Sequence, residues 1–173
     1  MNMQPHNTQE ILVALCKEAK RIEEDTTYSS KSHFNAAASW EFMNKCLGIP
    51  SVVLAALVGT TLIKNCPEIA SVCALVASLL TALMTFLKPN DKAAMHRASG
   101  NQYLSLRNEI RYFRTIDLVN AKSTDDLVKI LRSFGSRRDK LNQTCPSIPR
   151  RAFEMACKGI EEGEATYKVD DMS

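Results

Sequence analysis

Four hydroxyl side chains recur along one strongly apolar stretch of the chain, at spacings of seven, three and four residues. Such spacings place side chains on one face of a helix, because an α-helix turns once in 3.6 residues. One interpretation is an uncharged, mildly polar pore lining. The alternative is that each hydroxyl bonds to its own helix or across to a neighbouring helix. The candidate pore-lining residues are Ser71, Ser78, Thr81 and Thr85.

Two further groups of side chains, a pair of histidines and a set of arginines, are candidate functional residues. His33 and His96 flank the apolar stretch, where they could meet and sense pH; the alternative is that both are ordinary polar helix residues. A set of arginines could bind anionic lipid or a nucleotide phosphate, although a solvated face or intersubunit salt bridges are the default interpretation. This set is Arg97, Arg107, Arg111 and Arg114.

Motifs typical of catalysis are missing from the sequence. It contains no Gly-rich phosphate loop, no Gly-x-Ser-x-Gly and no His-Glu-x-x-His. The six cysteines are scattered, with no Cys-x-x-Cys pair and no histidine at ligand spacing. A net charge of +3 is too small to indicate nucleic acid as a partner. We therefore expect no enzyme activity, no metal, no cofactor and no nucleic-acid binding.

The hydroxyls lie in a region that dominates the interpretation of the whole chain. Residues 46–63 and 69–87 are two charge-free apolar runs, joined by a loop at 64–68 that carries Lys64 and Glu68. At about 1.5 Å per residue, each run is just long enough to cross a hydrocarbon core of about 30 Å. The mean hydropathy of −0.17 conceals this block. The sequence thus predicts a transmembrane helical hairpin at 46–87, with a lipid bilayer as its partner.

The charges outside the hairpin predict its orientation. Residues 1–45 carry five basic and six acidic side chains, residues 88–122 carry seven and three, and residues 123–173 carry nine of each. The short loop has no net charge. By the positive-inside rule, the basic excess after the second span places both termini in the cytoplasm.

The regions flanking the hairpin show helical periodicity, and no segment alternates with period two, so we predict an all-α membrane protein. Residues 1–45 are expected to form a cytoplasmic amphipathic helix that begins near Asn7 or Thr8. Pro50 either starts the first span or kinks a helix continuous with Trp40. Residues 88–173 are expected to form a cytoplasmic helical region, with helices at 92–117, after Ser123 and at 150–164.

Small residues recur at every fourth position of both spans. Without a hydrophobic drive between helices in lipid, small side chains hold helices together by letting their backbones approach closely. This indicates packing within the hairpin and between copies; the alternative is chance, because Ala and Ser are common. The residues proposed for packing are Ser51, Ala55, Gly59, Ala70, Ala74 and Ala82.

Several of these segments together resemble a known family. They are Tyr28-Ser-x-Lys-x-His-Phe34, Leu47-Gly-Ile-Pro50, Thr85-Phe-Leu-x-Pro89 and His96-Arg-x-x-Gly-Asn-x-Tyr-x-x-Leu-Arg107. Their order and spacing are similar to the SLATT family, the two-transmembrane effector domains associated with SMODS nucleotide cyclases and SLOG sensors. The resemblance covers roughly residues 15–140. Its cytoplasmic positions are His33, His96, Arg97, Asn101, Tyr103 and Arg107.

The resemblance implies a pore-forming effector of bacterial conflict or antiphage defence systems, placed in the inner membrane as a multi-pass protein. The trigger would come from an upstream signal or partner, with a signalling protein or a nucleotide second messenger as alternatives. Our first hypothesis is a homo-oligomeric membrane channel. The alternatives are a non-conducting anchor whose cytoplasmic helices bind a partner, and a holin-like lesion former without defined stoichiometry.

Overall fold

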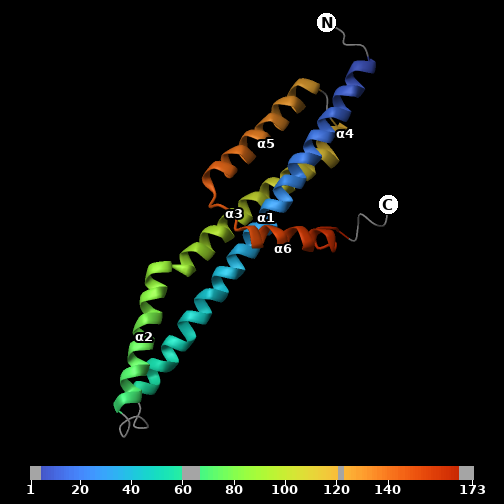
Figure 1. The fold of residues 1–173 in the computed structure, drawn as a ribbon. Coiled ribbons are helices and arrows are strands. Elements are labelled where there is room, and N and C mark those ends of the chain that lie inside the picture. The colour runs from blue at the N-terminus through green and yellow to red at the C-terminus, as the bar shows by residue number, and fades with distance from the viewer. Residues whose placement is uncertain (1–4, 60–66, 121–122, 168–173) are drawn as a thin grey trace. The chain divides into compact units, whose positions relative to one another are not determined.

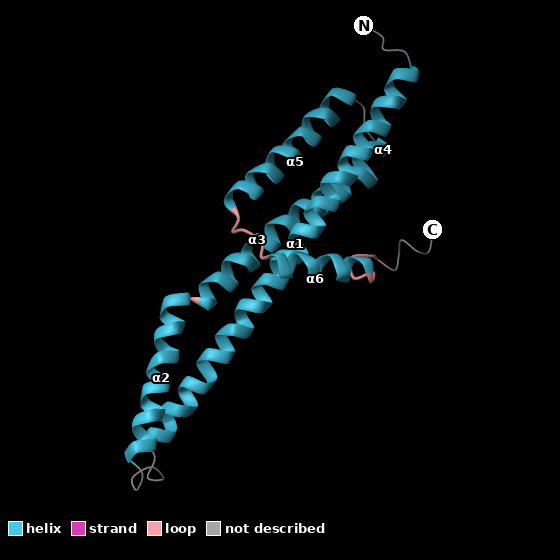
Figure 2. Ribbon diagram, in the orientation of Figure 1, coloured by secondary structure: helices cyan, strands magenta, loops and turns pink. Residues whose placement is uncertain are grey.

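The computed structural model describes residues 5–59, 67–120 and 123–167, which are helical apart from short connections and include no strand (Figure 2). The all-helical prediction is therefore confirmed for the described part of the chain. In chain order (Figure 1), the elements are α1 (Pro5–Val58), α2 (Pro67–Leu87), α3 (Pro89–Tyr112), the π-helical turn η2 (Phe113–Asp117), α4 (Leu118–Asn120), α5 (Thr124–Thr144) and α6 (Arg150–Glu161).

The chain divides into two compact units. Unit 1 is Met1–Asn35 together with His96–Ser173, and unit 2 is Ala36–Met95. Helices α1 and α3 each contribute one part to unit 1 and the other part to unit 2. Unit 2 contains the predicted hairpin of residues 46–87 and extends beyond it at both ends.

Helix α1 is one continuous helix of 54 residues. It begins at Pro5, so the predicted start at Asn7 or Thr8 is wrong, and it runs through Pro50 without a break. A proline inside a helix removes one backbone hydrogen bond and crowds the carbonyl four residues earlier, at a cost of about 3 kcal/mol, yet the helix continues past Pro50. Helix α1 ends at Val58. The predicted end of the first span at residue 63 and the loop residue Lys64 lie outside the described residues.

The hydroxyl-rich stretch Asp25–Ser32 is helical despite weak helix propensity. Thr26 donates its hydroxyl proton to the Ile22 carbonyl at 2.8 Å, and Ser32 does the same to Tyr28 at 2.7 Å. Both side chains are fully buried. Bonding to the preceding turn satisfies these hydroxyls inside the protein without opening the helix.

Helices α2 and α3 meet at a sharp backbone break. Lys88 adopts φ +46°, in the left-handed region, and its N–H bonds to the Met84 carbonyl at 3.0 Å. Pro89 then begins α3, three residues before the predicted start at Lys92. A left-handed non-glycine residue costs about 1–2 kcal/mol, and proline both ends the preceding helix and suits a first helical turn.

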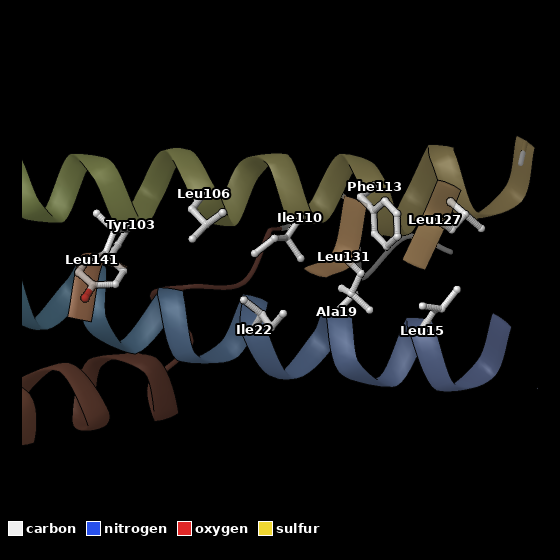
Figure 3. Packing of buried hydrophobic residues seen from close by; sticks show 10 residues of the cluster. All are labelled: Leu15, Ala19, Ile22, Tyr103, Leu106, Ile110, Phe113, Leu127, Leu131 and Leu141. Atoms are coloured by element: carbon white, nitrogen blue, oxygen red, sulfur yellow. The ribbon is translucent and has the colours of Figure 1, made fainter. Parts of the chain in front are cut away.

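The hydrophobic core of unit 1 joins α1, α3, η2 and α5 (Figure 3). Phe113, Leu106 and Ile110 are fully buried, and the Phe113 ring packs edge-on against Phe134 with 5.6 Å between centroids. Burying a side chain of this size stabilises by about 1.5–3 kcal/mol. The cluster consists of Leu15, Ala19, Ile22, Tyr103, Leu106, Ile110, Phe113, Leu127, Leu131 and Leu141.

A glycine lets α3 approach α1 closely in unit 1. A Cβ added to Gly100 would lie 2.9 Å from a ring carbon of Phe34, closer than real contacts allow. Glycine at this position is therefore required by the packing and not by its backbone angles. By contrast, Gly135 lies inside α5 with no atom within 4 Å of an added Cβ, so it neither ends nor interrupts that helix.

Candidate functional site

In unit 2, α2 lies beside the C-terminal part of α1 (Figure 1). The Ser51 hydroxyl oxygen lies 2.8 Å from that of Thr81 and 3.2 Å from the Ala77 carbonyl oxygen. Three residues before Ser51 on α1, a Cβ added to Gly48 would lie 3.3 Å from the Met84 methyl carbon. Small residues and one partly buried hydroxyl pair thus bring the two helices together.

Helix α2 presents three different faces. Ala77 and Met84 face α1, while the large apolar side chains Val72 and Leu79 lie roughly opposite and are exposed. The hydroxyls of Ser71, Ser78 and Thr85 repeat every seven residues, so they form a stripe between these two faces. The stripe therefore borders the contact with α1 and is not hidden in it.

Each hydroxyl of the stripe donates its proton to its own helix. Ser71 bonds to the Pro67 carbonyl at 2.9 Å, Ser78 to Ala74 at 2.8 Å and Thr85 to Thr81 at 3.0 Å. The Thr81 hydroxyl likewise donates to the Ala77 carbonyl at 2.9 Å. Bonds of a hydroxyl to its own helix are what the alternative to a pore lining predicts. All four residues are nevertheless exposed. A back-bonded hydroxyl still offers its lone pairs outward as an acceptor.

Ser78 and Thr85 of the stripe and several of the small residues line one open groove of about 850 Å³. Among the predicted packing residues, Ser51 is buried, whereas Ala55, Gly59, Ala74 and Ala82 are exposed. The four exposed residues are thus available for contact with another helix. The groove is lined by Ser51, Ala55, Ala77, Ser78, Thr81, Ala82, Thr85 and Phe86.

Sequence reasoning missed Gly48 and Ala77, the two smallest residues of the observed contact. Counting every fourth residue from Ala70 passes over Ala77. The missed signal is a spacing of seven, which places Ala70, Ala77 and Met84 on one helix face. Ala70 is partly buried on that face, as this spacing predicts.

The outer surface of these helices is strongly apolar. Two helices are long and apolar enough to cross a membrane, and only 6% of the most apolar window of each is buried inside the molecule. Leu75 is 71% exposed and Phe86 84%. A core helix of a water-soluble protein buries such side chains, and large exposed apolar patches mark a surface that contacts something else.

In unit 1, His33 on α1 and His96 on α3 meet in the interior. Their Nδ1 atoms lie 3.0 Å apart, and both side chains are buried. The His33 ring also stacks on Tyr103 at 5.5 Å, and the Tyr103 hydroxyl donates to the Asn142 side-chain oxygen at 2.7 Å. The two histidines thus lie in contact, which was one of the two possibilities that the sequence left open.

The histidine pair is stable when both rings are neutral. One Nδ1 then donates its proton and the other accepts it, whereas two imidazolium rings would point donors at each other. Burial and the neighbouring charge of His96 lower the pKa of His33 to about 4, and burial lowers the pKa of His96. The pair therefore resists protonation at neutral pH, and acid would disrupt it.

The remaining arginines and family-resembling residues lie in different places. Arg114 is paired with Glu23 of the same chain at 3.0 Å, whereas the default interpretation was a solvated face or a salt bridge between subunits. Arg97 and Asn101 are exposed on α3. Arg107 donates to the Ala165 carbonyl at 3.1 Å, so it contacts the segment that follows α6. The four arginines therefore do not form one site.

Within the described ranges, no group of three or more His, Cys, Asp or Glu side chains could hold a metal ion. The buried histidines supply only two nitrogen ligands, and their Nδ1 atoms are already directed at each other. The chain was also compared with known proteins. No protein-family model, no curated protein and no solved structure matches it.

Proposed function

We propose that the protein is a homo-oligomeric membrane channel whose pore is lined by the hydroxyl stripe of α2. One observation carries the proposal. The apolar surface of unit 2 is exposed, and it is interrupted by a groove that combines small side chains with outward-facing hydroxyl oxygens. A bilayer would cover the apolar surface, while the groove suits a second helix or water.

In this proposal, residues 46–87 form a transmembrane hairpin with both termini in the cytoplasm. The contacts of Gly48 with Met84 and of Ser51 with Ala77 support antiparallel packing of its two helices. Lys92 lies 4.4 Å from the centre of the Trp40 ring, and such a pair suits a membrane–water interface. The basic excess at 88–122 supports the orientation.

The channel requires several copies, because two helices cannot enclose an aqueous path. The groove supports an oligomer, since its exposed Ala55 and Ala82 would let a helix of a neighbouring copy approach closely. The outward hydroxyl oxygens of Ser78 and Thr85 would then face the lumen as acceptors. Acceptor atoms favour cations over anions, so we expect a cation preference.

The resemblance to the SLATT family supports a role for this channel as the membrane-disrupting effector of a bacterial conflict or antiphage defence system. Its place would be the inner membrane. Opening would follow an upstream signal, delivered by a signalling protein or a nucleotide second messenger. The densely packed unit 1 offers a domain that such a partner could bind.

Cysteine accessibility tests the pore directly. In a background without the six native cysteines, Ser78→Cys and Thr85→Cys report on the stripe, and Val72→Cys and Leu79→Cys report on the opposite face. A charged, membrane-impermeant thiol reagent should modify the stripe positions and block ion flux in liposomes, because only a lumen holds water at this depth. The opposite face should stay unmodified, because lipid covers it.

A second candidate is a non-conducting anchor, favoured by the internal hydrogen bonds of the three stripe hydroxyls and of Thr81. It predicts equal protection of the stripe and the opposite face, a monomer or dimer by native mass spectrometry, and no flux. A holin-like lesion former would give flux with a broad range of oligomer sizes. One closed ring with selective labelling of the stripe supports the channel alone.

A further inference from the structure

The segment that follows α6 covers a group of cations in unit 1. Glu164 forms an ion pair with Lys31 of α1, and the Tyr167 ring lies 4.8 Å from the guanidinium carbon of Arg111 and 5.5 Å from that of Arg107. Arg107 also donates to the Ala165 carbonyl at 3.1 Å. We call residues 163–167 the strap and Lys31, Arg107 and Arg111 the cation cluster.

Two glycines shape the strap. Gly163 has φ +89°, and the Glu164 N–H bonds to the Gly159 carbonyl at 2.9 Å while the Gly163 N–H bonds to Ile160 at 3.0 Å, which is a Schellman end to the helix. A Cβ added to Gly159 would lie 2.5 Å from a Glu164 carboxylate oxygen. The turn and the missing Cβ together place the Glu164 carboxylate over the cluster.

The strap does not satisfy the cluster. Among the described residues, these three cations face one carboxylate, one neutral carbonyl and two tyrosine rings, and the Nε of Arg107 is buried there without an acceptor. Burial, followed by the charge of Arg107, lowers the pKa of Lys31, so the two cations repel each other. An anion with more than one negative charge and several acceptor oxygens would fit this cluster better than Glu164 does.

The strap is also held weakly. The Glu164 side chain is 57% exposed and that of Lys31 27%, and an ion pair as exposed as this contributes little to stability. A competing anion therefore has little to displace. The aromatic contact of Tyr167 with two guanidinium groups is a cation–π interaction of similarly modest strength at an exposed position.

We propose that Lys31, Arg107 and Arg111 form a binding site for a multivalent phosphate group, which the strap occupies in the free protein and which the phosphate takes over by displacing Glu164. The phosphate could belong to a soluble molecule or to a lipid headgroup. The site goes beyond the proposed channel and does not rest on it, since binding here needs no conduction.

The test uses the full chain in lipid nanodiscs, with inorganic pyrophosphate as the soluble probe and phosphatidylinositol 4-phosphate in the nanodisc as the lipid probe. Calorimetry measures pyrophosphate binding, and hydrogen exchange measures the amides of the strap. Binding should raise strap exchange by about tenfold or more. A response to pyrophosphate, to the lipid or to both supports the site and identifies the source; a response to neither overturns it.

Matched variants separate this site from general attraction of anions. Arg107→Gln should weaken pyrophosphate binding by about tenfold or more, and Glu164→Gln should strengthen it several-fold, because the internal competitor loses its charge. Arg150 and Glu154 form an exposed pair at 2.8 Å on α6, so Arg150→Gln and Glu154→Gln serve as controls that should change nothing. The proposal would be overturned if Arg107→Gln and Arg150→Gln changed the affinity for pyrophosphate equally, or if Glu164→Gln did not raise that affinity. If Arg107→Gln unfolds, Arg111→Gln repeats the test.

Discussion

The two units of this protein use the same apolar residue types in opposite ways. In unit 1, Phe113 and Leu106 are fully buried against neighbouring helices, whereas in unit 2, Phe86 is 84% exposed and Leu75 71%. Water drives the first arrangement, because it expels apolar side chains into a core. The second is stable only where the surroundings are themselves apolar, and there helices are held by small residues and hydroxyl pairs instead.

The sharpest test of this contrast is a matched pair of phenylalanine truncations. Phe113→Ala should lower the free energy of unfolding by about 3–5 kcal/mol, because it leaves a cavity in the core of unit 1. Phe86→Ala should lower it by less than about 1 kcal/mol, because this ring contacts detergent or lipid both before and after unfolding. Urea denaturation in a mild detergent, followed by circular dichroism, gives both values. Equal losses would mean that the two units are stabilised alike.

Acid should destabilise unit 1 through the histidine pair. The pKa of His33 is about 4 in the folded protein, against 6.5 for an ordinary histidine, so between these values the unfolded chain binds more protons. Stability is therefore complete above about pH 6.5 and falls as the pH drops towards 4, by about 3 kcal/mol, since one pKa unit corresponds to about 1.4 kcal/mol.

Urea midpoints measured between pH 4.5 and 7.5 test the histidine prediction. His33→Gln keeps a polar side chain without a titrating ring, so it should flatten the dependence below pH 6.5. An unchanged slope in this variant would assign the acid sensitivity to other groups.

Substitution by alanine at two glycines of unit 1 should change its stability in opposite directions. Gly100→Ala should destabilise unit 1 by about 1–3 kcal/mol, because its Cβ would overlap Phe34. Gly135→Ala should stabilise it by up to about 1 kcal/mol, because the site is an open helix interior. Thermal unfolding of both variants decides the matter, and a stabilising Gly100→Ala would show that α1 and α3 are not tightly packed there.

The smallest effect is expected for the hydroxyl pair of unit 2. A hydrogen bond between helices in a membrane contributes about 0.6 kcal/mol, so Ser51→Ala and Thr81→Val should show a coupling of that size in a double-mutant cycle. Ser78→Ala with Thr81→Val is the control, because the Ser78 hydroxyl bonds only to its own helix at Ala74. Unfolding in mixed detergent and dodecyl sulfate micelles measures the coupling, which should be absent from the control pair.

Much of the helical architecture could be predicted, because it follows from local patterns. The apolar runs and the helical character of the regions that flank them were readable from composition and helical periodicity. The helix predicted to begin at residue 150 does begin at Arg150. Helix ends were less accurate. The helix after the second span was predicted to begin at Lys92, whereas α3 begins at Pro89, because composition alone does not mark where backbone hydrogen bonding starts.

The candidate sites were only partly predictable. The sequence singled out His33 and His96, and the residues Ser78 and Thr85, but not the contact of Gly48 with Met84. It also gave no sign that Glu164 and Lys31 pair, since they are separated by 133 positions. Such contacts depend on how helices from distant parts of the chain are placed side by side, which no local pattern encodes.

By itself, the sequence determined that this chain is helical, that it carries two stretches apolar enough for a membrane, and where its hydroxyl, histidine and basic side chains stand along each helix. These properties follow from helical periodicity and from the chemistry of single residues. Only the tertiary structure decided which faces meet. In the tertiary structure, Nδ1 of His33 contacts Nδ1 of His96, the Ser51 hydroxyl contacts that of Thr81, and Glu164 forms an ion pair with Lys31. These partners are selected because packing between helices depends on the shape of side chains as well as on their type.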